Sequence, residues 1–128
     1  MYSKKILERF SNPSYAGGIR GGNGTGKVEK ENEVAKIYLV VDEDGVIETA
    51  KFKAYGGVCT IAACDTVCSL IEDNSLSDAL AICKEDILEE LGDIPDNKQD
   101  SIEIALECVK LAVEDYYNKK QKELKKSK

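Results

Sequence analysis

The chain has 128 residues, with 18 basic and 24 acidic side chains, a formal net charge of −6, and enough hydrophobic residues (42 %) to build a core. This length predicts a single domain over residues 1–128. The acidic balance argues against nucleic-acid or anionic-membrane partners, because the cationic excess that neutralises phosphate is missing. No apolar run approaches the roughly 20 residues of a membrane span, and the charged start of the chain is not typical of a secretory leader.

The first 27 residues predict a short helix followed by a flexible loop. Apolar side chains recur at helical spacing up to Phe10. The Asn12-Pro13 pair ends this N-terminal helix, within residues 1–13, because the residue before a proline avoids the helical region. Six of the ten glycines lie in the next stretch, which predicts a glycine-rich loop over residues 14–27.

One segment of this loop is close to a nucleotide-binding motif. The run Gly21–Val28 nearly fits G-x-x-x-x-G-K-[ST], in which backbone amides cradle phosphate and a hydroxyl holds magnesium. That motif needs a strand before it and a helix after it, whereas here glycines precede the run and a strand-like alternation follows it. Val28 also replaces the hydroxyl, so we interpret the run as a connecting loop.

The rest of the chain predicts strands first and helices afterwards. An apolar β-branched run at 37–41, a hairpin signal at 42–45 and alternation up to Ala54 predict three antiparallel strands that begin near Thr25. Helical periodicity then predicts helices over 59–71, 75–83 and 85–91, and a last helix that begins near Asp100-Ser101. The basic end, residues 119–128, predicts a solvated, frayed tail. We therefore expect an α+β fold, a three-stranded antiparallel sheet with helices packed on one face.

The chain contains five cysteines and no histidine, so the commonest general base and metal ligand is absent. The odd number of cysteines and a start that is not typical of a leader favour reduced thiols in the cytoplasm. The lack of any Cys-x-x-Cys pair argues against a zinc ribbon or a thioredoxin-type site. Cys64, Cys68, Cys83 and Cys108 lie in helical apolar patterns, and we expect all four in the core. Cys59 lies at the start of a predicted helix, where the helix dipole favours thiolate. It is either a functional thiol or a small buried residue.

Several segments taken together resemble the scaffold family for iron–sulfur cluster assembly, of the IscU type and the NifU N-terminal type. They keep the family's order over residues 2–113: YSKKILERFSNP (2–13), KIYLVVD (36–42), IETAKFKAYG (47–56), IA (61–62) and LGDIPDNK (91–98). The resemblance implies three antiparallel strands with helices on one face, in agreement with the expectation above. It also implies an assembly platform and not a turnover enzyme, with a cysteine desulfurase as partner, and it leaves a homodimer open.

The chain departs from this family wherever the family holds its cluster. The resemblance places the family's three cysteines on Glu31, Gly57 and Ser101 of this chain. It places the family's aspartate on Glu33 and its histidine on Asp100. A three-thiolate site therefore cannot form within one chain, because soft sulfur ligands hold iron–sulfur clusters. The family's chaperone-recognition segment keeps only Pro95 and Lys98 here, which leaves Lys98 as a candidate partner-binding residue.

Three hypotheses remain open. In the first, the protein is a scaffold with an altered ligand site, in which Cys59 accepts sulfur and holds iron or an iron–sulfur cluster together with nearby acids. In the second, it is a cluster-free adaptor or regulator that binds a cysteine desulfurase. In the third, oxygens of Glu31, Glu33, Asp100 and Ser101 bind a divalent metal; the alternative is that these acids are solvated surface residues.

Overall fold

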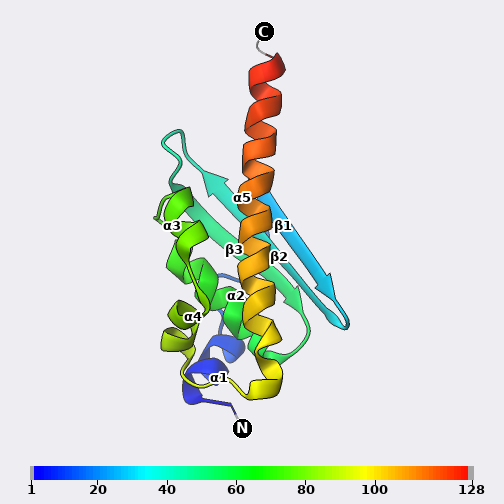
Figure 1. The fold of residues 1–128 in the computed structure, drawn as a ribbon, viewed down its shortest axis with the longest axis vertical. Coiled ribbons are helices and arrows are strands. Elements are labelled where there is room, and N and C mark those ends of the chain that lie inside the picture. The colour runs from blue at the N-terminus through cyan, green and yellow to red at the C-terminus, as the bar shows by residue number, and fades with distance from the viewer. Residues whose placement is uncertain (1, 127–128) are drawn as a thin grey trace.

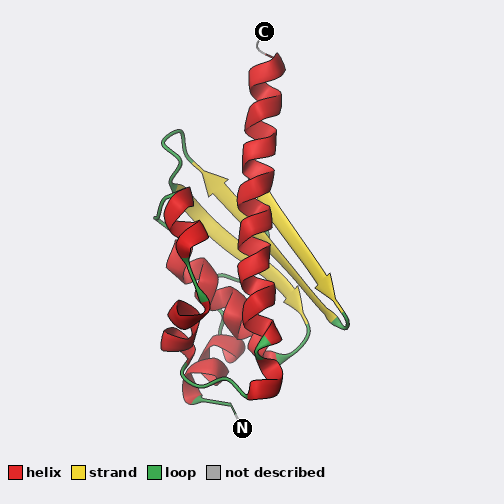
Figure 2. Ribbon diagram, in the orientation of Figure 1, coloured by secondary structure: helices red, strands yellow, loops and turns green. Residues whose placement is uncertain are grey.

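The computed structural model describes residues 2–126 and has the expected α+β fold (Figures 1 and 2). The elements in chain order are α1 (Lys4–Ser11), β1 (Gly24–Lys30), β2 (Glu33–Val41), β3 (Ile47–Tyr55), α2 (Val58–Ile71), α3 (Leu76–Ala81), α4 (Lys84–Leu91), the 3-10 turn η1 (Asp96–Lys98) and α5 (Asp100–Lys126). The strands form one antiparallel sheet in the order β1-β2-β3. The predicted strands and helices are therefore confirmed, with ends that shift by one or two residues.

The core lies between the sheet and the helices that cover one of its faces. Helix α5 packs along β1 and β2, and α2 packs on β3 and on α5. Alternate residues of the middle strand, Ala35, Ile37 and Leu39, point into this core and are fully buried. Because successive side chains of a strand point to opposite faces, the residues between them lie on the other face of the sheet. Figure 2 shows no helix on that face.

The glycine-rich stretch differs from the prediction at its end. The expected loop reaches residue 27, but β1 already begins at Gly24. A Cβ atom at Gly26 would lie 2.3 Å from the carbonyl oxygen of Cys108 and 2.5 Å from the backbone nitrogen of Ala112, both in α5. The glycine is therefore there to let a helix approach a strand closely, and the structural context that a phosphate-binding loop requires is absent.

The basic C-terminal segment also differs from the prediction. Helix α5 continues to Lys126, and its last turns project beyond the sheet (Figure 1). Residues 119–126 are solvated as expected, but they are helical instead of frayed, and Lys119 forms an ion pair with Asp115 one turn earlier at 3.0 Å. Residues 127 and 128 of the predicted tail lie outside the described part of the chain. Among residues 2–126, no helix combines the length and the apolar character that crossing a bilayer requires.

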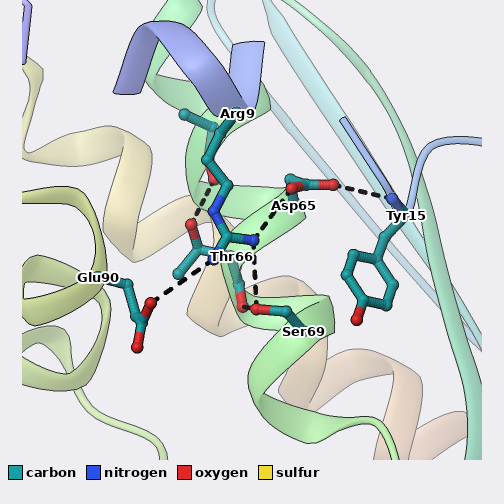
Figure 3. Close-up of polar contacts among 7 residues, drawn as sticks. Arg9, Tyr15, Asp65, Thr66, Ser69 and Glu90 are labelled. Carbon is teal, nitrogen blue, oxygen red and sulfur yellow. Dashed lines mark hydrogen bonds and ion pairs between the residues drawn. The ribbon is translucent and has the colours of Figure 1, made fainter. Parts of the chain in front are cut away.

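A polar cluster ties α1 and the chain after it to α2 (Figure 3). The carboxylate of Asp65 in α2, which is 1 % exposed, accepts hydrogen bonds from the Arg9 guanidinium at 3.1 Å and from the Tyr15 backbone N–H at 2.9 Å. Arg9 also donates to Ser69 at 3.3 Å and lies 3.6 Å from the Glu90 carboxylate of α4. The buried charge is thus paired and hydrogen-bonded, as a buried carboxylate requires.

Candidate functional site

The residues that the resemblance singled out gather around one cavity at an end of the sheet. The turn between β1 and β2, the loop before α2 and the segment that enters α5 meet there and enclose about 340 Å³. The lining residues are Glu31, Asn32, Glu33, Gly56, Gly57, Asn97, Lys98, Asp100 and Ser101. The structure therefore brings all the predicted site residues together except Cys59, which is not among the lining residues.

Tight backbone geometry positions the two glutamates of this cavity. Glu31 lies in the turn between the paired residues Lys30 and Glu33 and has a φ of 54°, in the left-handed region that non-glycine residues rarely adopt. Across the cavity, a Cβ atom at Gly56 would lie 2.8 Å from Cγ of Glu33, so glycine allows the loop before α2 to close on this side chain. Glu31 is consequently exposed at the rim, while Glu33 is partly buried.

A chain of hydrogen bonds runs from Glu33 into the core. The Thr60 hydroxyl donates to Oε1 of Glu33 at 2.6 Å, and the Gly57 backbone N–H donates to the same oxygen at 3.1 Å. Because the single hydroxyl proton of Thr60 goes to the carboxylate, the Ser101 hydroxyl donates to Oγ1 of Thr60, 3.0 Å away. Ser101 is 3 % exposed, so its hydroxyl is turned inward to join β2, α2 and α5.

Sequence reasoning missed Thr60, the residue that links the two sides of this site. Its side chain is fully buried, and its hydroxyl forms hydrogen bonds with Glu33 on one side and with Ser101 on the other. A threonine in the first turn of a predicted helix is a weak signal, because it is equally common as a helix-start residue. Only the packing of α5 against α2 brings Ser101 to it.

The charges around the cavity are mixed. Lys30 approaches Asp100 at 3.9 Å, and both side chains are more than 45 % exposed, so this pair contributes little stability. Lys98 adds a second cation at the rim, from η1. The cavity therefore presents three carboxylates together with lysine side chains, in place of a set of thiolates.

The burial of Cys59 favours the second of the two alternatives that its sequence position left open, a small buried residue. The residue is 1 % exposed, and this burial raises the pKa of its thiol, with a lowering contribution from Lys98 and a further raising contribution from Glu33. Desolvation is the largest of these contributions, because burial disfavours the charged form of the thiol. The thiol is therefore a protonated, sheltered group and not an activated nucleophile.

The other cysteines divide between the core and the surface. Cys64, Cys68 and Cys108 are buried as predicted, and burial raises the pKa of each thiol. Cys83 was predicted in the core and is exposed, which makes that prediction wrong. It begins α4, where the Asp86 carboxylate accepts its backbone N–H at 2.9 Å and its thiol at 3.2 Å. The acid three residues later is a helix-start signal that could have revealed this position.

The donor atoms of the cavity do not suit an iron–sulfur cluster. They are carboxylate, hydroxyl and amide oxygens and lysine nitrogen, with no sulfur, whereas such clusters are held by thiolates or imidazoles. Across residues 2–126, no group of three or more His, Cys, Asp or Glu side chains has an arrangement that could hold a metal ion. The three acids line one cavity, but they do not converge on one point.

Comparisons with known proteins give a consistent result. The family profile described as "NifU-like N terminal domain" matches residues 1–123. The chain is 35 % identical over 126 residues to an iron–sulfur cluster assembly scaffold protein IscU of Buchnera aphidicola, covering 94 % of this chain and 98 % of that protein. It is 33 % identical over 125 residues to the protein of the same name from Escherichia coli K12, covering 94 % and 97 %. The solved N-terminal NifU-like protein of Brucella abortus has a TM-score of 0.76 at 12 % identity, over 91 % of this chain and 94 % of that one, which shows the shared fold.

Proposed function

Because the chain belongs to the family of NifU-like N-terminal domains, we propose that it acts in iron–sulfur cluster assembly as a scaffold-like protein with an altered ligand site. Relatives that it matches over almost their whole length are named scaffold proteins of this process. Within that role we favour the cluster-free form, an adaptor or regulator that binds a cysteine desulfurase and has no turnover chemistry of its own.

One observation carries this choice: the cavity formed by the aligned ligand positions contains oxygen and nitrogen donors but no sulfur. Gly57 supplies no side chain at all, and the hydroxyl of Ser101 is committed to Thr60. A cluster built in this cavity would lack the soft ligands that hold iron and sulfide together. The chain has the fold of the family, but the side chains at the positions that would bind a cluster are different.

The burial of Cys59 argues in the same direction. Transfer of sulfur from a desulfurase persulfide requires a thiolate that can reach the donor sulfur, and thiolate character controls the rate. Cys59 is 1 % exposed and its thiol pKa is raised. A persulfide on this residue would require a local opening that exposes the sulfur.

Lys98 is the residue that we assign to partner binding. Its side chain is exposed on η1 at the rim of the cavity, where it can meet an acidic group without a change in the fold. Exchanging it for glutamate reverses one charge at the rim and leaves the core untouched. Lys110, which is exposed on α5 outside the cavity, offers a matched control for the same exchange.

The test is an anaerobic reconstitution with ferrous iron, cysteine and a cysteine desulfurase, followed by absorption spectroscopy and by size-exclusion chromatography of the mixture. We expect a desulfurase complex without a visible cluster chromophore, which Lys98→Glu weakens and Lys110→Glu leaves intact. A stoichiometric chromophore that disappears in Cys59→Ala would instead establish cluster scaffolding. The absence of any complex would remove the adaptor role.

A second candidate is the binding of ferrous iron as cargo through carboxylates, and the shared cavity of Glu31, Glu33 and Asp100 favours it. One oxygen of Glu33 is engaged by Thr60 and Gly57, so iron would bind the other oxygen and draw the two exposed acids inward. Anaerobic calorimetry with ferrous iron, without desulfurase, separates this case. Stoichiometric binding that is lost in Glu33→Gln supports it, and no measurable heat rejects it.

A further inference from the structure

One face of the sheet is not covered by any helix (Figure 2). The strand register places a row of lysines directly across this face. The pairing places Lys27 of β1 opposite Lys36 of β2, and Lys36 opposite Lys53 of β3. Lys51 lies opposite Tyr38 in the next row. These residues alternate with buried ones along each strand and therefore share the face away from the helices. The backbone at Gly17 and Gly18 lies beside the side chains of Lys51 and Lys53, so the loop before β1 borders this face. We call them the lysine face, and we infer that it binds an acidic surface of a partner protein.

Stability of the fold does not account for this arrangement. Like charges directly opposite each other on a sheet are unfavourable, and here three of them are consecutive across the strands. The chain has 24 acidic side chains to distribute, yet only Lys27 has a carboxylate partner, Glu29 at 2.7 Å. In the part of the chain that the structure describes, Lys36, Lys51 and Lys53 form no ion pair. Their charges are left for a partner to neutralise.

Aromatic side chains complete the surface. The ammonium of Lys36 lies 5.2 Å from the ring centroid of Tyr38, a cation–π contact that keeps the charge close to the sheet. Tyr55, in the row beyond Lys53, is 75 % exposed and faces Val34 across the strands. Exposed tyrosines are enriched in protein interfaces because they bury a large area while keeping a polar end. The lysine face therefore combines charge with apolar area that can be buried.

The size of this surface favours a protein over a nucleic acid. Adjacent strands lie about 4.8 Å apart, so the row from Lys27 to Lys53 spans only about 10 Å. Such a row can neutralise a few phosphates, while the rest of a chain with a net charge of −6 would repel a polyanion along its length. A compact group of carboxylates on a protein surface matches the length of the row from Lys27 to Lys53, and the side chains around such a group can pack against the tyrosines.

A second copy of this chain is the less favoured occupant. Helix α4 offers Glu85, Asp86 and the exposed Glu89, so acidic and basic surfaces coexist on one molecule. When identical chains bind through two different surfaces, each added copy leaves one surface free. The assembly then grows as an open filament, unless the rotation between successive copies closes it into a ring. The inference concerns the sheet face and is independent of the desulfurase contact proposed at the cavity.

The test measures binding of a short fluorescein-labelled poly-glutamate peptide by anisotropy, from low ionic strength up to about 0.15 M salt. The variant Lys36→Gln/Lys51→Gln/Lys53→Gln is compared with Lys84→Gln/Lys110→Gln/Lys122→Gln, which removes the same charge from exposed helical positions. We expect at least about tenfold weaker binding in the first variant and little change in the second. Circular dichroism and thermal unfolding verify that both variants fold.

Four results would overturn the inference. The wild-type protein could fail to bind poly-glutamate at low salt, or both variants could lose affinity equally, which would indicate a response to net charge alone. An oligouridylate of equal charge could bind more tightly than the peptide, which would point to nucleic acid. Sedimentation could show wild-type oligomers that only the variant of the lysine face dissociates, which would identify a second copy as the occupant.

Discussion

Replacing Gly26 by alanine tests the closest contact in the fold. The new Cβ atom would lie 2.3 Å from the Cys108 carbonyl oxygen, 2.5 Å from the Ala112 nitrogen and 3.0 Å from Cβ of Leu111. Two of these three atoms belong to the helix backbone and cannot rotate away. To restore an ordinary contact of 3.4 Å, α5 would have to move away from β1 by about 1 Å.

The cost of this movement can be bounded from the contacts that it breaks. Overpacking of a core typically costs about 1–3 kcal/mol, and the upper end applies because backbone resists on the helix side. The same shift would stretch the hydrogen bonds of the Cys108 thiol to the carbonyls of Gly26 and Ala35, at 3.3 and 3.4 Å. We expect a loss of about 3 kcal/mol in the free energy of unfolding, which corresponds to a Tm lower by roughly 10 °C for a domain of this size.

Urea unfolding followed by circular dichroism measures this loss, and Gly21→Ala is the matched control. Gly21 has no atom within 4 Å of the new Cβ, and only its φ of 73° opposes the substitution, which costs about 1–2 kcal/mol. The difference between the two variants isolates the steric contact with α5. If Gly26→Ala is no less stable than Gly21→Ala, α5 does not approach β1 as closely as the structure shows.

Three further predictions concern buried polar and thiol groups. Asp65→Ala should lower the free energy of unfolding by about 2–3 kcal/mol, because it removes the acceptor of the Tyr15 backbone N–H and the partner of the partly buried Arg9. Asp65→Asn keeps an acceptor oxygen and should cost less in the same urea assay; equal losses would contradict the role of the hydrogen bond from Tyr15. Burial raises the pKa of the Cys108 thiol from its ordinary value of 9.0 to about 12, so the unfolded chain loses this proton first as the pH rises. The contribution of this thiol to stability should therefore be constant below pH 9.0 and fall by up to about 1.4 kcal/mol per pH unit between pH 9.0 and about 12. A denaturation midpoint that is unchanged from about pH 8 to pH 10 would refute this. A maleimide reagent should modify exposed Cys83 rapidly in the folded protein and buried Cys59 only at the rate of opening, and mass spectrometry of the labelled peptides distinguishes the two.

Local periodicity was sufficient to predict most of the secondary structure. Alternation in the segment up to Ala54 predicted the strands, and the Ser75 cap and Gly92 stop predicted the bounds of short helices that the structure confirms. The same apolar stripe placed Cys64 and Cys68 correctly in the core. These signals are local, because a residue's neighbours in the chain set its backbone preference and the face on which it lies.

The candidate site could be predicted only in outline. The aligned positions of Glu31, Glu33, Asp100 and Ser101 predicted one shared site, and the structure gathers these residues around one cavity. The role of Thr60 and the burial of Cys59 could not be predicted, because both depend on contacts between segments tens of residues apart. Hydrogen-bond partners and the pKa of a thiol follow from what surrounds a group in space.

The amino-acid order alone thus determined the strands and the helices, since these depend on residue type and short-range spacing. The loss of sulfur ligands was implied by the resemblance to the scaffold family, which supplied the positions to compare. Tertiary structure alone decided that Gly26 is a point of contact with α5, that Cys59 is sheltered, and that three lysines stand side by side on the face away from the helices. The register between strands and the distance between a helix and a strand depend on contacts between residues that are far apart in the chain. They therefore cannot be predicted from a short stretch of sequence.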